Sequence, residues 1–165
     1  MPEKATLERA KKDKREGKAA STQAGEFVRE EIEHIREGKH GARSTKQAIA
    51  IGLSKARRAG VDLPPPEKGE TSERTRRSAQ SAYRAGRQSD HEVSPSRSRA
   101  AKNALKREGR AAASKKALAK QARASASNRT AGDRSAAARK AVKTKGAAGR
   151  SEAARKAART RAKKS

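Results

Sequence analysis

Large apolar residues gather in one stretch of the chain, residues 22–63, and are scarce on either side of it. The first group follows the i, i+4, i+7 spacing that lines one face of an α-helix, with an aromatic residue beside it: Val28, Ile32, Ile35 and Phe27. This pattern predicts a helix from about residue 23 to residue 37. Gly38 stands where a C-terminal glycine ends such a helix.

A second helix is predicted to begin at Ser44. Ser44 and Gln47 have the spacing of a capping box, in which the N-cap side chain binds the backbone N–H of the third helical residue. Apolar residues then recur on one face, and Gly60 and a run of three prolines end the segment. Together the two helices predict a helical hairpin over residues 22–63, with a core formed by Phe27, Val28, Ile32, Ile35, Ile49 and Leu53.

The hairpin has little apolar surface for its size. Its nine large apolar side chains are too few to offset the conformational entropy that is lost when about 40 residues become ordered. We therefore expect the hairpin to self-associate as a homo-oligomer or to dock on a protein partner.

The rest of the chain lacks a core-forming pattern. Residues 1–21 are predicted to form a charged N-terminal arm, and residues 64–95 a linker rich in Pro, Ser and Arg. Residues 96–165 are predicted to form a basic low-complexity tail. Few Leu, Ile, Val or Phe residues are present and the net charge is high. This composition predicts a chain that is mostly disordered, all-α where it is ordered, and without strands.

The tail is rich in good helix formers, namely Ala, Lys and Arg, but repulsion between its like charges opposes helix formation in the free chain. Glycines at positions 109, 132, 146 and 149 divide it into helix-forming segments at about 98–108, 111–124, 134–143 and 151–163. We expect these segments to be disordered when free and partly helical when bound to a polyanion.

The positive charge is concentrated at the C-terminal end of the chain. Residues 93–165 hold 23 Lys and Arg residues against three acidic ones, which places +20 of the net charge of +26 there. A segment of this charge density needs a polyanion, and the abundant polyanions of a cell are DNA and RNA. The sequence therefore predicts a nucleic-acid-binding protein of the cytoplasm rather than an enzyme.

Contacts with the phosphate backbone are expected rather than base recognition. The chain has no cysteine for a zinc finger, no leucine heptad after the basic region and no aromatic residue in the tail that could stack on unpaired bases. These features favour duplex DNA, bound without sequence preference. The candidate contact residues are Arg97, Arg99, Lys102, Lys106, Arg107, Arg110, Lys115, Lys116, Lys120, Arg123, Arg139, Lys140, Lys143, Lys145, Arg155, Lys156, Arg159, Arg161, Lys163 and Lys164.

Two other functions fit the same charge distribution. A basic tail does not distinguish DNA from RNA, so an RNA- or ribosome-associated factor is one alternative. The other is an adaptor whose hairpin carries a protein partner to the nucleoid. No membrane partner is expected, because no apolar run approaches the roughly 18 residues that span a bilayer and the N-terminus lacks the apolar region of a secretory signal.

The hairpin also allows a helix-turn-helix interpretation, in which its second helix enters a DNA groove. The cations available for that purpose are Lys46, Lys55, Arg57 and Arg58. The first helix is acidic and would repel a duplex, so docking or self-association is the favoured role of the hairpin.

The histidines, His34, His40 and His91, invite a search for a metal site. Glu33, His34, Glu37 and His40 have a spacing that gathers ligands on one helix face. Gly38 is expected to end the helix before His40, and no apolar shell is available to support a site. We therefore expect no metal, no cofactor and no catalytic centre.

Residues 25–66, and above all the run Lys46-Gln47-Ala48-Ile49-Ala50-Ile51, resemble a bacterial family of small basic proteins of uncharacterised function that are often labelled DNA-binding. The tail is similar in composition to the Lys/Ala-rich ends of linker histones and of bacterial histone-like proteins. These resemblances imply nucleoid binding, although the winged domain of a linker histone is missing from the sequence.

Overall fold

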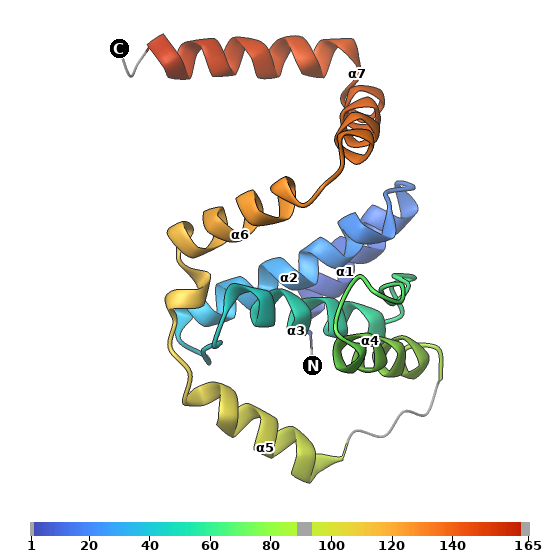
Figure 1. Cartoon of the computed structure of the whole chain (residues 1–165), viewed down its shortest axis with the longest axis vertical. Coiled ribbons are helices and arrows are strands. Elements are labelled where there is room, and N and C mark those ends of the chain that lie inside the picture. The colour runs from blue at the N-terminus through green and yellow to red at the C-terminus, as the bar shows by residue number, and fades with distance from the viewer. Residues whose placement is uncertain (1, 89–93, 163–165) are drawn as a thin grey trace. The chain divides into compact units, whose positions relative to one another are not determined.

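The computed structural model of the chain describes residues 2–88 and 94–162 (Figure 1). Within these residues lie seven α-helices and one short 3-10 helix, and no strand: α1 (Lys4–Arg15), α2 (Ala20–Glu37), α3 (Thr45–Arg58), α4 (Glu73–Ala85), α5 (Pro95–Lys106), η1 (Ala111–Ala113), α6 (Lys115–Ser127) and α7 (Ala131–Ala162). The prediction of an all-α protein is confirmed for this part of the chain. The prediction of a mostly disordered chain is wrong, because helices take up most of it.

Alanine explains why the shortage of large apolar residues did not prevent folding. Most of the buried apolar side chains are alanines: Ala10, Ala24, Ala42, Ala48, Ala56, Ala79, Ala82, Ala85, Ala112 and Ala113. Small side chains let helix backbones approach closely, so that dispersion contacts between the backbones themselves contribute to the core. Counting only large apolar residues therefore underestimated the core of this chain.

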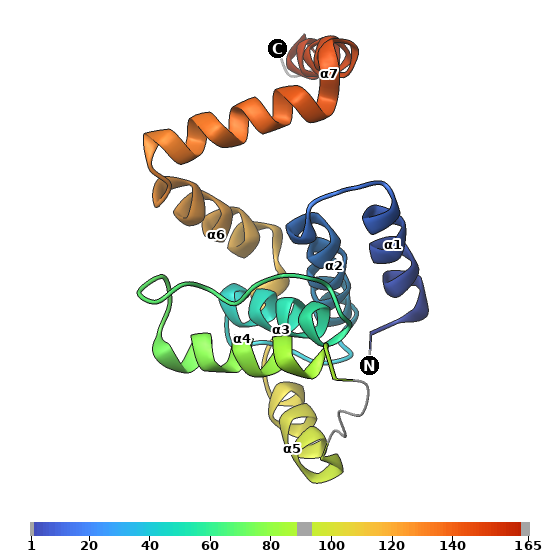
Figure 2. The same cartoon turned by 90° about the vertical axis from the view of Figure 1, so that its right-hand side faces the viewer.

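The chain divides into two compact units, Met1–Gln121 and Ala122–Ser165. In the first unit the helices pack in series, α1 on α2, α2 on α3 and α3 on α4, as Figure 1 and Figure 2 show. The second unit contains the end of α6 and the whole of α7.

Helices α2 and α3 occupy the segments in which the hairpin was predicted. Gly38 follows α2 in the left-handed conformation (φ 80°) that favours glycine, and its N–H donates to the Ile35 carbonyl at 3.2 Å. Ser44 caps α3 and accepts a hydrogen bond from the Gln47 N–H at 3.2 Å. The Gln47 side chain accepts from the N–H of Arg43 at 2.7 Å, one residue before the position that a regular capping box uses.

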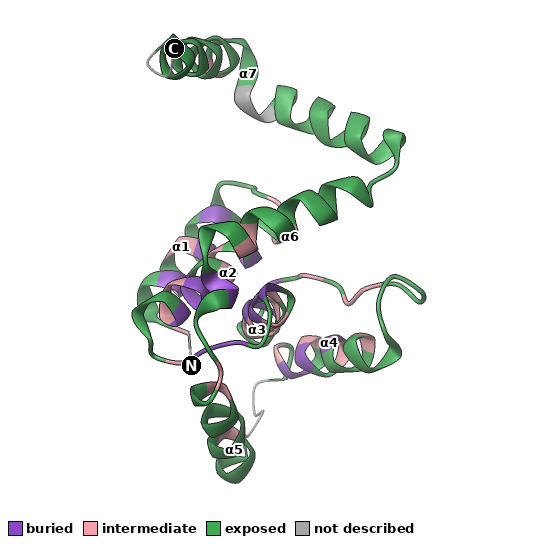
Figure 3. Ribbon diagram, turned by 60° about the vertical axis from the view of Figure 1, so that its left-hand side comes forward, coloured by how far each residue is buried: buried purple, intermediate pink, exposed green. Residues whose placement is uncertain are grey.

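Five of the six predicted core residues of the hairpin take part in two clusters instead of one, and Ile49 belongs to neither cluster. Phe27, Ile32 and Ile35 are buried, whereas Val28, Ile49 and Leu53 are half-buried. One cluster surrounds Ile32 and Ile35, and the other surrounds Phe27. Figure 3 shows this burial along the inner sides of the helices of the first unit.

Residues 1–21, predicted as an arm, contain helix α1, which packs on α2. Ala10 is buried in the cluster of Phe27. The backbone N–H of Glu3 donates to the Glu30 carboxylate at 3.0 Å, and the Arg9 guanidinium pairs with Glu26. These contacts tie the charged N-terminal segment to the hairpin.

The segment predicted as a linker, residues 64–95, contains helix α4. Ser72 caps it by accepting a hydrogen bond from the Thr75 N–H at 3.3 Å. The helix packs on α3, and its buried residues are Ala79, Ala82 and Ala85. The sequence pattern missed this helix because its buried stripe consists of alanines alone.

The beginning of the basic tail is part of the first unit. The Thr45 hydroxyl donates to the Ala112 carbonyl at 2.7 Å, and Arg36 Nε donates to the Ala113 carbonyl at 3.0 Å. Both alanines are buried beside the isoleucines of α2, and Leu118 packs against the same cluster. The tail was predicted to be disordered from residue 96 onwards; around η1 that prediction is wrong, because hydrogen bonds and apolar contacts hold the segment on α2 and α3.

The remainder of the described tail is helical as well, in α5, α6 and α7. Gly146 has φ 63° and produces a kink inside α7, at one of the predicted breaks (Figure 1). Gly132 and Gly149 lie within that helix and do not interrupt it. An isolated glycine costs a helix about 1 kcal/mol, which weakens the helix without having to end it.

Candidate nucleic-acid interface

The predicted phosphate-binding cations are exposed wherever the structure describes them. Seventeen of the twenty have exposed side chains on α5, α6, α7 or the intervening turns. The side chains of Lys145, Lys163 and Lys164 lie outside the described residues. Helix formation thus leaves the described cations of the tail accessible to a polyanion.

Helix α7 carries no apolar stripe, and its described residues are exposed except for Gly149, which is half-buried (Figure 3). Its Lys and Arg residues recur at spacings that distribute them around the helix instead of gathering them on one face. A helix of this kind needs no apolar partner. The small alanine side chains between the cations leave the helix narrow.

The acidic residue at the start of α7 serves as a cap. The Asp133 carboxylate accepts hydrogen bonds from the Thr130 hydroxyl at 2.7 Å and the Thr130 N–H at 3.1 Å, and the Thr130 hydroxyl in turn accepts from the N–H of Asp133 at 3.1 Å. These bonds lower the pKa of Asp133. The carboxylate therefore stays charged at the positive end of the helix dipole, where it stabilises the helix.

The cations proposed for a helix-turn-helix on α3 are largely engaged inside the protein. Arg57 is buried and donates to the carbonyls of Leu63 and Pro64 at 3.1 Å each, and burial lowers its pKa. The Lys55 ammonium lies 2.6 Å from the carboxylate of Glu31. Of the four cations, Lys46 and Arg58 alone have exposed side chains. Two of the four cations that the helix-turn-helix interpretation would use are therefore accessible on α3.

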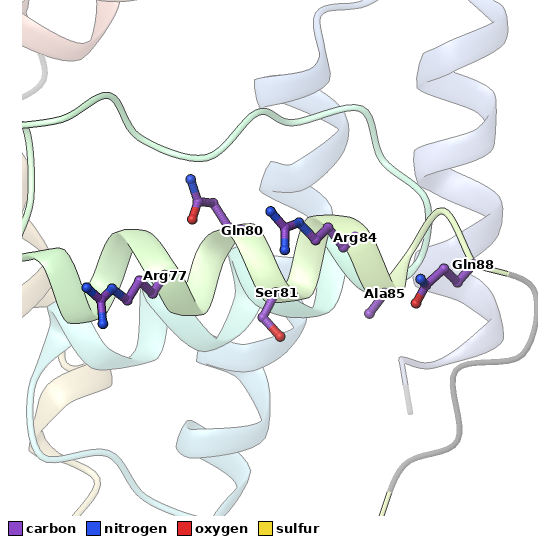
Figure 4. A pocket seen from close by; sticks show the side chains of 6 residues that line it. All are labelled: Arg77, Gln80, Ser81, Arg84, Ala85 and Gln88. Atoms are coloured by element: carbon purple, nitrogen blue, oxygen red, sulfur yellow. The ribbon is translucent and has the colours of Figure 1, made fainter.

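A second basic surface, not foreseen from the sequence, lies on α4. A surface hollow of about 370 Å³ is lined by side chains that Figure 4 shows: Arg77, Gln80, Ser81, Arg84, Ala85 and Gln88. Arg77 and Arg84 are seven residues apart, two helical turns, and both are exposed. The spacing of these arginines was the available signal. It was obscured because acidic residues elsewhere in residues 64–92 bring the net charge of that segment close to zero.

Acidic partners hold several side chains of this region in place. Arg76 binds Glu73 through two hydrogen bonds of 2.8 and 3.0 Å, and these bonds lower the pKa of Glu73 to about 2. The Tyr83 hydroxyl donates to Asp62 at 2.6 Å, and the Arg87 guanidinium lies 3.8 Å from the centre of the Tyr83 ring. Arg77 Nε also donates to Glu73, at 3.2 Å, so Arg77 is paired as well as exposed.

The structure brings together a different set of potential metal ligands from the set that the helical spacing suggested. Glu31, His34 and His40 each offer a ligand atom within 4.8 Å of the others. Glu33 pairs with Arg29 instead, and the Glu37 carboxylate pairs with Lys39. The third histidine, His91, lies outside the described residues.

None of the described helices combines the length and the apolar composition that crossing a bilayer requires. No curated protein and no solved structure matches the chain. Residues 5–68, which run from α1 to just past the prolines after α3, match the family of unknown function DUF6496 and are similar to its members.

Proposed function

We propose that this protein binds nucleic acid without sequence preference, through contacts between its C-terminal cations and backbone phosphates. One observation carries the proposal: +20 of the net charge of +26 lies in residues 93–165, where the described candidate cations are exposed on helices and on the turns between them. Duplex DNA is the proposed partner, and this would place the protein on the bacterial nucleoid.

The chemistry of such binding is the release of counterions from the nucleic acid. Each phosphate that a Lys or Arg neutralises releases a fraction of a condensed cation, so the logarithm of the binding constant falls linearly with the logarithm of the salt concentration. If 6–10 of the cations contact phosphates at once, the slope is about −5 to −9. The tail has no aromatic side chain for base stacking, which favours backbone contacts.

The two units have different parts in this proposal. The unit Ala122–Ser165 carries 14 Lys and Arg residues against two acidic ones, and it supplies most of the phosphate contacts. The unit Met1–Gln121 adds the nine candidate cations from Arg97 to Lys120 and the exposed arginines of α4, Arg74, Arg77 and Arg84.

The hairpin was predicted to self-associate because it has little apolar surface for its size. In the structure, α1, α4 and η1 of the same chain cover α2 and α3. Among the described residues the exposed large apolar side chain is Val142, which lies on α7 and not on the hairpin. The proposal therefore requires no second copy of the chain and no protein partner.

The test is competitive binding of duplex DNA, duplex RNA and single strands across a salt series, using the full chain and a chain that ends at Gln121. Ending the chain before residue 93 would remove buried Ala112 and Ala113, whereas ending it at Gln121 keeps the first unit whole. We expect the steep salt slope to need residues 122–165 and to be the same for unrelated duplex sequences.

Two outcomes would contradict this function. A preference for structured RNA over duplex DNA would identify an RNA-associated factor. Affinity that persists at high salt in the chain ending at Gln121 would place specific recognition in the first unit.

A further inference from the structure

The turn after α2 returns His40 to the helix that it follows. Glu31 and His34 are three residues apart on α2 and so lie on the same face. The left-handed Gly38 reverses the chain, and His40 Nε2 then lies 3.3 Å from Glu31 Oε1. The turn is held by hydrogen bonds from the N–H of Gly41 to the Leu105 carbonyl at 2.9 Å and from the N–H of Ala42 to the Gly109 carbonyl at 3.1 Å.

The contacts of His40 fix the hydrogen on one of its two ring nitrogens. Its Nδ1 lies 3.0 Å from the carbonyl oxygen of Gly41, and a carbonyl only accepts, so Nδ1 carries the hydrogen of this bond. In the neutral ring, Nε2 then has a lone pair, and this lone pair faces a carboxylate oxygen of Glu31. Two acceptors at this distance repel each other unless a cation lies between them.

The carboxylate of Glu31 also needs positive charge. Glu31 is 1% exposed, and among the described residues its Oε2 accepts no hydrogen bond, although the Lys55 ammonium lies 2.6 Å away. The same ammonium lies 3.5 Å from the carboxylate of Glu30, which is 2% exposed. Two buried carboxylates thus share one lysine, which leaves a net charge of −1 in a region where unpaired charge is costly.

His34 is oriented by a carboxylate from the N-terminal segment. Its Nε2 lies 2.8 Å from Glu3 Oε1, which also accepts from the Lys39 ammonium at 3.1 Å. The rings of His34 and His40 meet edge to face, with centroids 6.1 Å apart. A carboxylate bound to a histidine in this way fixes the orientation of the ring, as outer-shell carboxylates do in metal sites.

We propose that Glu31, His34 and His40 bind a divalent transition-metal ion of the zinc type. Two imidazoles and one carboxylate suit Zn²⁺, with water completing a tetrahedron. Zinc bonds of this kind hold ligand atoms about 3.3 Å apart, so the three atoms, now within 4.8 Å, must draw together as the turn at residues 38–41 adjusts. Lys55 then keeps its contact with Glu30. The metal joins α2 to the turn on which the segment before η1 is bound.

The direct test is titration of the metal-free full chain with Zn²⁺ by calorimetry at neutral pH, with Co²⁺ as a spectroscopic probe of coordination. We expect saturation at one equivalent, a visible Co²⁺ spectrum of the four-coordinate type and a higher melting temperature with Zn²⁺. His34→Gln and His40→Gln each remove one ligand, and we expect each to weaken binding at least about 100-fold, more than outer-shell changes do.

Matched variants separate this site from non-specific metal binding. Glu33→Gln removes a carboxylate of the same helix that pairs with Arg29, and His91→Gln removes an imidazole to which no ligand role is assigned. Both should bind Zn²⁺ as the unaltered chain does, and circular dichroism should show equal helix content in all variants. Absence of saturable binding would overturn the proposal and leave a proton as the cation between His40 and Glu31. Binding that survives His40→Gln would also overturn it.

Discussion

Gly52 of α3 lies against the backbone of Val28 of α2 so closely that a Cβ atom at position 52 would stand 2.6 Å from the Val28 Cα. No side chain fits this contact without separating the helices. We predict that Gly52→Ala lowers the free energy of unfolding by about 1–3 kcal/mol, because overpacking outweighs the gain in helix propensity. Urea unfolding, followed by circular dichroism, measures the effect.

Gly25 provides the matched control for this substitution. It lies in α2, it is exposed, and a Cβ atom there would meet nothing within 4 Å. Gly25→Ala should stabilise the protein by about 0.5–1 kcal/mol through helix propensity alone. Equal effects of the two substitutions would show that α2 and α3 do not approach as described.

The docking of η1 yields a second prediction. Ala113 is 1% exposed beside Ile35, and its carbonyl accepts from Arg36. Ala113→Asp places a carboxylate in this buried apolar contact, which costs about 2 kcal/mol or more unless the segment detaches. We expect a lower melting temperature and faster amide hydrogen exchange at Gly41 and Ala42, whose N–H groups bind the segment before η1.

The control for η1 is Ala111→Asp. Ala111 belongs to the same short helix and has the same size, but it is exposed. The substitution adds the same negative charge as Ala113→Asp, but at an exposed position. It should therefore leave the melting temperature and the amide exchange at Gly41 nearly unchanged. If Ala111→Asp and Ala113→Asp behave alike, charge and not burial is responsible, and the docking of η1 is refuted.

The sequence revealed the parts of the fold that large apolar residues mark. The spacing of Val28, Ile32 and Ile35 indicated α2, and Ser44 marked the start of α3, both close to their observed bounds. The buried residues of α4 and η1 are alanines, and α1 buries Ala10 beside two polar residues, Thr6 and Asp13. Alanines also occur throughout the exposed tail. A sequence does not distinguish a buried alanine from an exposed one, so these contacts could not be predicted from it.

The candidate sites likewise include one that the sequence reveals and one that depends on the folded structure. Charge counting located the basic tail, because charge is additive along a sequence. The cluster of Glu31, His34 and His40 could not be found in this way, since it depends on a reversal of the chain. Gly38 was interpreted as the end of the helix. Its left-handed conformation also sends the following residues back over the last turn, which places His40 against Glu31.

The tyrosine of this chain should report on its own hydrogen bond. Donation from the Tyr83 hydroxyl to the Asp62 carboxylate raises the pKa of Tyr83 above its ordinary value near 10. A phenol with a raised pKa contributes stability that is complete below the unfolded pKa, and this contribution is lost as the pH rises through the folded pKa. Because Tyr83 is the single tyrosine and tryptophan is absent, the absorbance of tyrosinate measures its titration directly.

Asp62→Asn removes the charge that opposes ionisation of the phenol. We expect the titration of Tyr83 to move to lower pH in this variant, since the Arg87 guanidinium over the ring then acts without the carboxylate. Titration at the same pH in both proteins would mean that the hydrogen bond between Tyr83 and Asp62 does not form in solution.

The proposed nucleic-acid binding predicts that the location of a charge matters more than its contribution to the total. Replacing four exposed cations of α7 by glutamine should make the salt slope shallower by up to about 3–4, because each phosphate contact contributes about 0.9. The residues are Arg139, Lys143, Arg155 and Arg159. Glutamine is nearly as good a helix former as the residues it replaces, so circular dichroism should show unchanged helix content.

The matched control removes the same charge from α1, at the exposed side chains of Lys4, Lys11, Lys12 and Lys14. Lys11 and Lys12 pair with Glu8 and Glu16, so their replacement also releases carboxylates that repel a polyanion. If phosphates lie along α7, the α1 variant keeps the slope of the unaltered chain to within about one contact. Equal losses in the two variants would mean that the chain attracts nucleic acid only through its overall charge. The C-terminal helices would then have no distinct part in binding.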